Sequence, residues 1–443
     1  MGGDDEVRVV VDPEWVGRRL AVRLRPRQLL AVHAELHGFD AVELRGGVAR
    51  SHLAAPPASA ATSLADAVRL VVGSLDDRPL ELELSGGLDS RVLLAAAVAT
   101  GAPVHRAFTI GGPHDDDRRR AVDLAARTGL QHDIVDPADL DPDDTAALVR
   151  LAVAAGTDRG WVANPIDAAV LHWVEDQRGT GAGLSGQNGE IARGFYYRGP
   201  HRLARPNHRV AALVRWRLLA NAANDPQLLR PDLASGRDEL VEAAVAEWLD
   251  PSSSRRFLES TDDFYLRHRM TRWVGPAYAA AARRHPVVAP FLSVGFVHEA
   301  LRLSPGERRH STAMASVAVQ LAPELAALPL AHGPAPARLA RGTGRAALAG
   351  LDGQRRKAWG KVRQRLGGAP ARPVGTPVIA AAVASCRESL VDLLADDPLL
   401  AASGLARARA SADARDLAFL LSLAAWRAPD AAPDLATVLL REN

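Results

Sequence analysis

Residues 85–90 combine two hydroxyls, two glycines and a carboxylate in the order Ser-Gly-Gly-Leu-Asp-Ser. Glycines let the backbone curl tightly and expose N–H groups that bind phosphate oxygens. The hydroxyls of Ser85 and Ser90 can donate to the same oxygens, and Asp89 suits a Mg²⁺ ion that bridges phosphates. The stretch therefore predicts a cradle for a nucleoside triphosphate. The plainer alternative is a Gly-Gly turn in which Asp89 and Ser90 cap a helix.

The elements around this loop place it at the tip of a strand. Residues 79–85 alternate as a strand does, and residues 88–101 put apolar side chains on one helical face that ends at Gly101. Further elements alternate along the chain, with strands at 103–110, 132–136 and 181–185 and helices at 63–75, 115–129 and 141–155. Such repeats predict a parallel sheet with right-handed crossovers, in which ligands bind outside the carboxyl ends of the strands.

The first strand has one unusual feature. Glu81 and Glu83 alternate with its leucines, whereas a central parallel strand is usually apolar throughout. We therefore expect one face of that strand to be partly exposed.

The chain divides into three parts by composition. Residues 54–63 are rich in Pro, Ala and Ser, as linkers are, and strand signals stop after about residue 200, where helices rich in Ala, Leu and Arg follow. A loop-like region occupies 332–376. We expect a short β-containing segment at 1–62, an ATP-binding α/β half at 63–199 and a helical half at 200–443. The expected fold class is α/β, with a mostly helical C-terminal half.

Composition narrows the possible partners. The net charge of +2 over 443 residues is too small to argue for nucleic acid. No apolar run is long enough for a membrane span, and the N-terminus lacks the apolar core of a secretory signal. Cys386 is the only cysteine, so an internal disulfide is impossible. We expect a cytoplasmic protein that binds neither membranes nor nucleic acid.

The loop at 85–90 resembles the SGGxDS loop of the PP-loop ATP pyrophosphatases. More closely, it resembles the C-terminal synthetase domain of asparagine synthetase, β-lactam synthetase and lasso-peptide macrolactam synthetases. The stretch GLSGQNGEIARGFYYRG at 183–199 is similar to that family's second motif, SGxGGDExxxGxY, and AFTIGG at 107–112 to its TFS stretch. The resemblance runs from about residue 63 to 330. It implies a parallel sheet of the adenine-nucleotide α-hydrolase type.

The resemblance also implies an activity and its site residues. Family members adenylate a carboxylate with Mg-ATP, release pyrophosphate and pass the acyl group to an amine. The implied ATP contacts are Leu84, Ser85, Gly86, Gly87, Asp89, Ser90, Thr109, Ile110, Ser185 and Gly186. The implied Mg²⁺ ligands are Asp89 and Glu190. The second motif of this chain is one residue shorter than that of the family and lacks its Asp, and Glu190 is the nearest carboxylate. The alternative interpretation of Glu190 is a charge at a helix N-terminus without a role in metal binding.

Two departures concern activation of the amine. Two residues after Ser185 the family often has Glu or Tyr, whereas this chain has Gln187, which cannot act as a general base. The Glu that precedes the family's PFL element is also missing, and His285 is there instead. Amine activation is therefore altered or supplied by the substrate. His285 is the catalytic candidate, and an ordinary packed histidine is the alternative.

The lysines are a third candidate site. Of the 54 Lys and Arg residues only Lys357 and Lys361 are lysines, both in RRKAWGKVRQ. The family places one lysine late in its synthetase domain, where it neutralises the departing pyrophosphate. A compact ammonium suits a point contact with phosphate, so we expect one of the two, with Lys357 preferred, to act there. The alternative is a basic surface, with an arginine on the pyrophosphate.

Together these patterns predict an AMP-forming amide synthetase. Its substrates would be small-molecule or peptide carboxylates and amines in a specialised pathway. Its protein partners would be other proteins of that pathway or a second copy of the chain in a homodimer. Gly2 follows Met1 where the family's glutaminase has its cysteine, so we expect no glutaminase activity. Two alternatives are a catalytically degenerate homologue that serves as a binding or scaffold subunit, and another PP-loop reaction such as tRNA thiolation.

Overall fold

The computed structural model describes residues 42–45, 48–51, 61–75, 79–161, 164–179, 181–218, 226–235, 237–341, 375–410, 413–427, 432 and 434–440. No helix among them is long and apolar enough to cross a membrane. They form an α/β fold with a mostly helical C-terminal half, as the sequence predicts.

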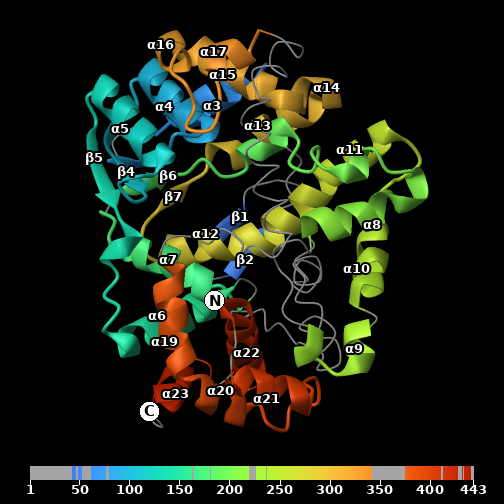
Figure 1. Ribbon diagram of the computed structural model, residues 1–443. Coiled ribbons are helices and arrows are strands. Elements are labelled where there is room, and N and C mark those ends of the chain that lie inside the picture. The colour runs from blue at the N-terminus through green and yellow to red at the C-terminus, as the bar shows by residue number, and fades with distance from the viewer. Residues whose placement is uncertain are drawn as a thin grey trace, which may run out of the picture.

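A five-stranded parallel sheet lies in the upper half of the molecule (Figure 1). Its strands, in the order β5-β4-β3-β6-β7, are Gln131–Val135 (β5), Val104–Ile110 (β4), Leu80–Glu83 (β3), Ala182–Leu184 (β6) and Val287–Val288 (β7). The four predicted strands are confirmed, and β7 is a short addition that the sequence did not indicate. The chain order reverses between β3 and β6. In an open α/β sheet the ligand crevice lies at such a point, outside the carboxyl ends of the strands.

The helices of the predicted ATP-binding half have clear sequence boundaries. They are Leu64–Gly73 (α3), Leu88–Thr100 (α4), Asp116–Thr128 (α5), Thr145–Asp158 (α6) and Pro165–Asp176 (α7). Two of them, α4 and α5, pack on the sheet. The predicted end of α4 is confirmed, because Gly101 adopts the left-handed conformation with φ of 70°. Helix α6 begins four residues after its predicted start, where Asp144 accepts a hydrogen bond from the Ala147 N–H.

The expectation of an exposed face on β3 is wrong at Glu81. Its residue exposure is only 2%, and its Oε1 accepts a hydrogen bond from the Gly181 N–H at 3.3 Å. Glycines make this burial possible, because a Cβ at Gly179 would lie 2.1 Å from Glu81 Oε1. The residues that follow α7 therefore cover the acidic face of the strand.

The rest of the described chain is largely helical. Its α-helices, together with the π-helix Tyr265–Val274 (η7), are Arg209–Leu213 (α8), Pro231–Ser235 (α9), Arg237–Ala246 (α10), Ser254–Phe264 (α11), Gly275–Ala282 (α12), Val294–Arg302 (α13), Pro305–Arg308 (α14), Thr312–Leu321 (α15), Pro323–Ala326 (α16), Pro336–Leu339 (α17), Thr376–Ser385 (α19), Arg387–Leu393 (α20), Ala402–Ala410 (α21), Ala414–Arg427 (α22) and Leu435–Leu440 (α23). Short turns of helix are Pro137–Asp139 (η1), Gly189–Arg193 (η2), Pro200–Arg202 (η3), Pro206–His208 (η4), Val214–Leu218 (η5), Pro226–Leu228 (η6), Pro290–Leu292 (η8) and Arg309–Ser311 (η9).

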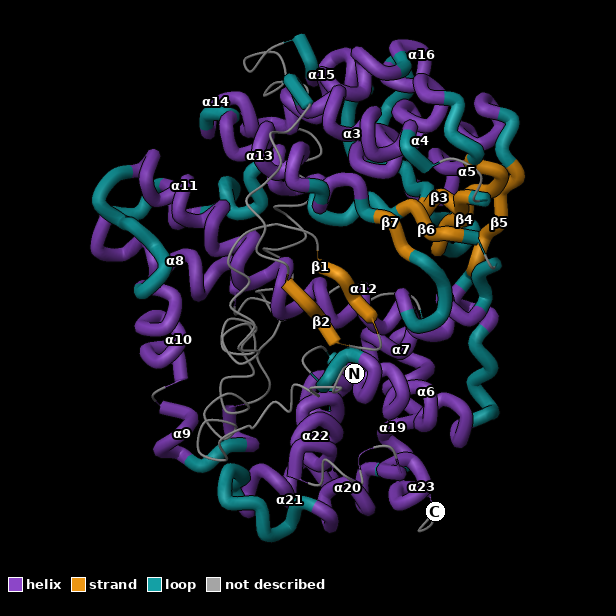
Figure 2. Tube along the Cα trace, turned by 180° about the vertical axis from the view of Figure 1, so that it is seen from behind, coloured by secondary structure: helices purple, strands orange, loops and turns teal. Residues whose placement is uncertain are grey.

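A separate ribbon of two antiparallel strands precedes the sheet. It consists of Val42–Arg45 (β1) and Val48–Ser51 (β2), and Figure 2 shows it apart from the parallel strands. Part of the β-containing segment predicted at 1–62 is thus found, whereas most of its residues lie outside the described part of the chain.

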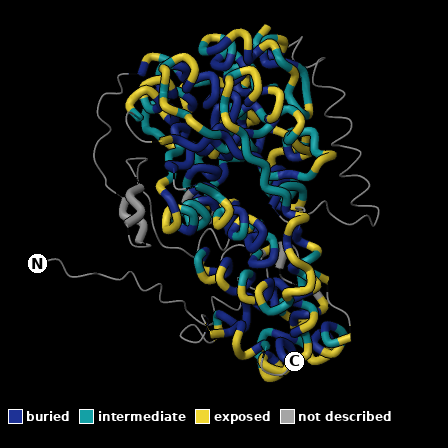
Figure 3. Tube along the Cα trace, turned by 90° about the vertical axis from the view of Figure 1, so that its left-hand side faces the viewer, coloured by how far each residue is buried: buried dark blue, intermediate teal, exposed yellow. Residues whose placement is uncertain are grey.

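Two hydrophobic cores hold the helices together. The upper core joins α3, α4 and α5 to α8, α10, α11, α13 and α15, whereas the lower core joins α6 and α7 to α19, α20, α21 and α22. Figure 3 shows buried residues inside both the upper and the lower part. Helices α6 and α7 thus pack against the C-terminal helices, although they belong to the predicted ATP-binding half. The domain boundaries at 62 and 199 stay predictions.

Candidate active site

The loop between β3 and α4 is closed by its two serines. Ser85 Oγ lies 3.0 Å from Ser90 Oγ and accepts a hydrogen bond from the Gly87 N–H at 3.1 Å. Ser90 Oγ in turn accepts from the Ser85 N–H and donates to the Ser85 carbonyl oxygen, both at 3.1 Å. The hydroxyls therefore fix the curl that the two glycines permit.

The N-terminus of α4 has no side-chain cap among the described residues. Its N-cap residue is Gly87, and neither Asp89 nor Ser90 bonds to the first-turn N–H groups. Helices α3, α5, α6 and α7 are each capped by a Ser, Asp or Asn side chain. The capping alternative for Asp89 and Ser90 is therefore wrong. The first turn of α4 keeps N–H donors and a positive dipole end that favour an anion such as a phosphate.

The loop after β6 lies directly against Asp89. A Cβ at Gly189 would lie 2.5 Å from Asp89 Oδ1, and a Cβ at Gly186 would lie 3.3 Å from both Asp89 Cβ and the Ser90 nitrogen. The backbones of the two loops thus approach each other more closely than a side chain at Gly189 would allow. The structure brings the two predicted motifs together at the crevice between β3 and β6.

The two predicted metal ligands share a cation from the protein itself. The guanidinium of Arg193 forms an ion pair with Asp89 and lies 3.8 Å from Glu190 Oε1. The Tyr265 hydroxyl donates to Glu190 Oε2 at 3.3 Å. The sequence reasoning missed both Arg193 and Tyr265. Arg193 follows Glu190 by three residues, and this spacing on a helical turn could have predicted that the two side chains meet.

The electrostatics of Asp89 favour a cation at this point. Burial raises the pKa of Asp89, Arg193 lowers it and the nearby Glu190 raises it again, so that the net pKa is about 7. The buried Oδ1 of Asp89 has no hydrogen-bond partner among the described residues. A divalent cation would supply the missing partner and neutralise both carboxylates. The residues present therefore fit Mg²⁺.

The number of protein ligands also fits this ion. No group of three or more His, Cys, Asp or Glu side chains that could hold a metal occurs in the described part of the chain. Mg²⁺ is commonly bound by one or two carboxylates together with substrate phosphates and water. A pair of carboxylates beside a phosphate-binding loop meets that requirement.

Three of the implied ATP contacts, Leu84, Thr109 and Ile110, lie at or just after the carboxyl ends of β3 and β4. Thr109 Oγ1 donates to the Leu84 carbonyl oxygen at 2.6 Å and lies 2.8 Å from His132 Nε2. Thr109 and Leu84 are buried, whereas Ile110 is partly exposed. The Thr109 hydroxyl thus ties the two strands together. The nucleotide contacts of these residues stay predictions.

A polar cluster joins the ends of β3 and β6. Ser185 Oγ donates to Glu83 Oε2 at 2.7 Å, and the Tyr278 hydroxyl donates to Ser185 Oγ at 3.0 Å. Arg178 Nη1 donates to Glu83 Oε1 at 3.1 Å. Burial raises the pKa of Tyr278 far above its usual value, so this phenol stays protonated. The sequence reasoning noted Glu83 only as an odd residue in a strand and missed Tyr278 and Arg178.

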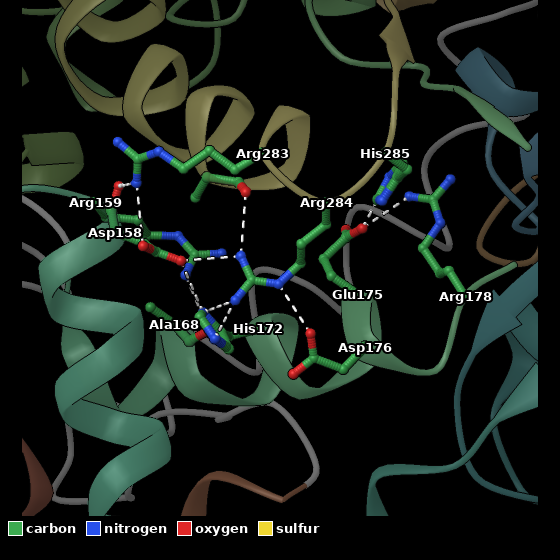
Figure 4. Close-up of polar contacts among 11 residues, drawn as sticks. Asp158, Arg159, Ala168, His172, Glu175, Asp176, Arg178, Arg283, Arg284 and His285 are labelled. Carbon is green, nitrogen blue, oxygen red and sulfur yellow. Dashed lines mark hydrogen bonds and ion pairs between the residues drawn. The ribbon is translucent and has the colours of Figure 1, made fainter. Parts of the chain in front are cut away.

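The catalytic candidate His285 lies beside Glu175, on the other side of which Arg178 approaches (Figure 4). Its Nε2 is 3.0 Å from an oxygen of Glu175, to which Arg178 also donates at 3.1 Å. Burial lowers the pKa of His285 to about 4, with the positive charge of Arg178 as a further cause. His285 is therefore neutral at pH 7, and its catalytic role stays a prediction.

The remaining residues considered for catalysis are Gln187, Lys357 and Lys361. Gln187 is exposed on the loop after β6. Lys357 and Lys361 lie outside the described residues.

A distant segment covers the first loop. The Ala331 N–H donates to the Gly86 carbonyl oxygen at 3.0 Å, and a Cβ at Gly86 would lie 2.5 Å from Ala331 Cβ. The buried Arg91 of α4 donates to the Pro329 carbonyl oxygen at 2.9 Å, to the Leu328 carbonyl oxygen and, at 3.5 Å, to the Leu325 carbonyl oxygen of α16. Gly86 is therefore needed for tertiary packing as well as for the turn.

The fold and this site define an α/β protein in which two loops meet at the switch point of a parallel sheet, where ligands bind in open α/β folds. Residues 60–317 match the family model for asparagine synthase, and this span contains the whole sheet and both loops. The chain belongs to the asparagine synthase family and is an ATP-dependent, asparagine synthase-like ligase. A search of curated proteins finds no match. The resemblance seen in the sequence is confirmed at the family level, whereas the nearer likeness to lactam-forming members stays a prediction.

Proposed function

We propose that this protein is an AMP-forming amide synthetase. It adenylates a carboxylate with Mg-ATP, releases pyrophosphate and passes the acyl group to an amine, forming an amide or a lactam. The observation that carries the proposal is the uncapped N-terminus of α4 beside the Asp89 and Glu190 pair. Phosphate donors and a carboxylate pair with an unpartnered oxygen are the two parts that a Mg-ATP site needs.

Each part of the crevice has a role in this proposal. The loop N–H groups and the hydroxyls of Ser85 and Ser90 bind the departing pyrophosphate. Asp89 and Glu190 hold Mg²⁺, which when bound neutralises charge on the phosphates. The edge of the nucleoside rests on residues from β3 and β4 (Leu84, Thr109 and Ile110), and the acyl group lies near Ser185 and Gly186.

The bond changes follow from this arrangement. An oxygen of the substrate carboxylate attacks the α-phosphorus, the bond from that phosphorus to the bridging oxygen breaks, and pyrophosphate leaves with the electron pair. Arg193, once released from Asp89, can bind the leaving oxygens.

A lysine, with Lys357 preferred, would assist Arg193 in binding the leaving pyrophosphate. Replacing that lysine by Ala should slow turnover about 100-fold, and an unchanged rate in the double Ala variant with Lys361 would assign the contact to an arginine.

Carboxylate-dependent exchange of labelled pyrophosphate into ATP tests the proposal. Purified protein is given Mg-ATP with a panel of amino acids, short peptides and organic acids, and the nucleotide products are identified. Exchange and AMP formation with at least one carboxylate are expected. Formation of ADP in proportion to product would overturn the proposal. Ammonium, glutamine and primary amines are then compared as nitrogen donors.

A degenerate synthetase that only binds nucleotide is the second candidate. It is favoured by Arg193, which already neutralises Asp89 and Glu190, and by Gln187, which cannot act as a base. This candidate predicts calorimetric binding of Mg-ATP without exchange for any carboxylate. A sulfur-transfer reaction has no comparable support, because Cys386 is buried in the lower core.

A further inference from the structure

Amide formation needs a group that accepts a proton from the amine. An amine is protonated at neutral pH, and its nitrogen can attack the acyl carbon only after a proton has left. Gln187 has no basic atom, and the neutral His285 is buried against Glu175. Asp89 and Glu190 are engaged by Arg193 in the free protein and would be engaged by Mg²⁺ in the loaded one.

Glu83 is placed differently from these groups. It is the last residue of β3, and the pairing of Leu82 with Leu184 puts it beside Ser185, which directly follows β6. Its side chain is 32% exposed, so a substrate can reach it. Glu83 is two residues before Ser85, and Gly186, next to Ser185, packs against the start of α4. Glu83 therefore lies at the switch point, between the two loops of the proposed ATP site.

The hydrogen bonds around Glu83 have a fixed direction. Tyr278 donates to Ser185, so the Ser185 hydroxyl proton points at Glu83 Oε2, at an oxygen distance of 2.7 Å. This direction of donation follows from the Tyr278 phenol, because burial raises its pKa and keeps it protonated. Glu83 is thus the final acceptor of this chain.

Arg178 holds the other carboxylate oxygen in place. The Arg178 side chain is 1% exposed, and its guanidinium stacks 4.1 Å from the centre of the Phe108 ring and donates to Glu83 Oε1. A Cβ at Gly183 would lie 2.4 Å from Arg178 Nη2, so β6 has a glycine where the guanidinium passes. Figure 4 shows the same guanidinium facing Glu175 on α7. The Glu83 carboxylate is therefore oriented from both sides, with Oε1 on the buried arginine and Oε2 toward the second loop.

We propose that Glu83 is the proton acceptor for the attacking amine, with Ser185, Tyr278 and Arg178 as positioning residues. The amine nitrogen bonds to the acyl carbon, the bond from that carbon to the phosphate oxygen breaks, and AMP leaves with the electron pair. One proton passes from the nitrogen to Glu83 Oε2 and then to water, and any further proton goes to water directly. This assignment rests on the proposed function and takes over the role that Gln187 cannot perform.

Separating the two half-reactions tests the assignment. For Glu83→Gln and the wild type, three rates are measured with a carboxylate that supports exchange in the wild type. They are the ATP–pyrophosphate exchange, amide formation with ammonium or methylamine, and hydroxamate formation with hydroxylamine, which is already unprotonated at neutral pH. Glu83→Gln should keep exchange and hydroxamate formation within about twofold and lose amide formation about 100-fold. The amide deficit should shrink as the pH is raised, because more free amine is then present.

Two further variants exclude a purely structural role. Glu175→Gln removes the other carboxylate on Arg178 and is the matched control, so it should change the three rates by the same factor. Tyr278→Phe, which keeps the ring, should lower amide formation about tenfold and leave exchange intact. Equal losses in all three rates for Glu83→Gln, or no loss of amide formation, would overturn the assignment. Absence of exchange in the wild type with every carboxylate would overturn the proposed function itself, and this assignment with it.

Discussion

Gly189→Ala tests the contact on which the proposed metal site depends. The added Cβ would lie 2.5 Å from Asp89 Oδ1 and 2.6 Å from Asp89 Cγ, whereas ordinary contacts begin at 3.4 Å. The carboxylate must therefore shift by about 1 Å or the two loops must separate. Either change misplaces one of the two proposed metal ligands.

The expected loss can be scaled from other metal sites. Removing a residue that orients a metal ligand typically lowers metal affinity 10- to 100-fold. The perturbation here acts on the ligand itself, so we expect the upper end, about 100-fold weaker binding of Mg-ATP, or about 2.7 kcal/mol. Binding of AMP should change less than about twofold, because AMP lacks the phosphates that would share the cation.

Calorimetry with a non-hydrolysable ATP analogue and with AMP, each with Mg²⁺, measures both affinities. Gly112→Ala is the matched control: it adds the same methyl group in the loop after β4, where the nearest atom, on Asp136, would be 3.6 Å away. It should leave both affinities unchanged. Unaltered Mg-ATP binding by Gly189→Ala, or an equal loss for AMP, would refute the reasoning.

Three other predictions concern metal binding, a buried ion pair and pH. Glu190→Ala should weaken Mg²⁺-dependent triphosphate binding about tenfold or more while sparing AMP; unchanged Mg-ATP turnover would show that Glu190 is no ligand. Arg308→Met leaves the buried Asp262 without its ion-pair partner and should cost about 3–5 kcal/mol in denaturant unfolding; a cost below about 1 kcal/mol would contradict this. Burial lowers the pKa of His201 to about 4, so its folded form resists protonation. The contribution of His201 to the free energy of unfolding should therefore be fully present above pH 6.5, the approximate pKa of histidine in the unfolded chain. It should fall by about 3 kcal/mol as the pH approaches 4. His201→Asn should flatten that part of the stability profile, and an unchanged slope would assign it to other groups.

The first loop could be recognised from the sequence because its chemistry is local. The donors for phosphate, the glycines of the turn and Asp89 all lie within six residues of one strand–helix junction. Hydrophobic periodicity gave the flanking strand and helix correctly for the same reason, since it depends on neighbours along the chain. The order β5-β4-β3-β6-β7 then places the second loop beside the first, which handedness and connection rules make predictable.

Contacts between segments that are distant in the chain could not be predicted from local residue patterns. The sequence rule for parallel strands led to an exposed face for β3, whereas the residues after α7 bury Glu81 against glycines. Nothing near Gly86 indicates that Ala331 packs on it, or that Tyr278 of α12 donates to Ser185.

The sequence by itself therefore determined the phosphate-binding loop, the parallel sheet and the family, because each depends on the type and spacing of nearby residues. Only the tertiary structure decided which charged groups meet. Arg193 pairs with the largely buried Asp89, and the buried Arg178 pairs with Glu83, because a charge withdrawn from water needs a partner of opposite charge. Which partner it meets depends on how the two loops and α7 pack around the crevice, and residue spacing along the chain does not specify that packing.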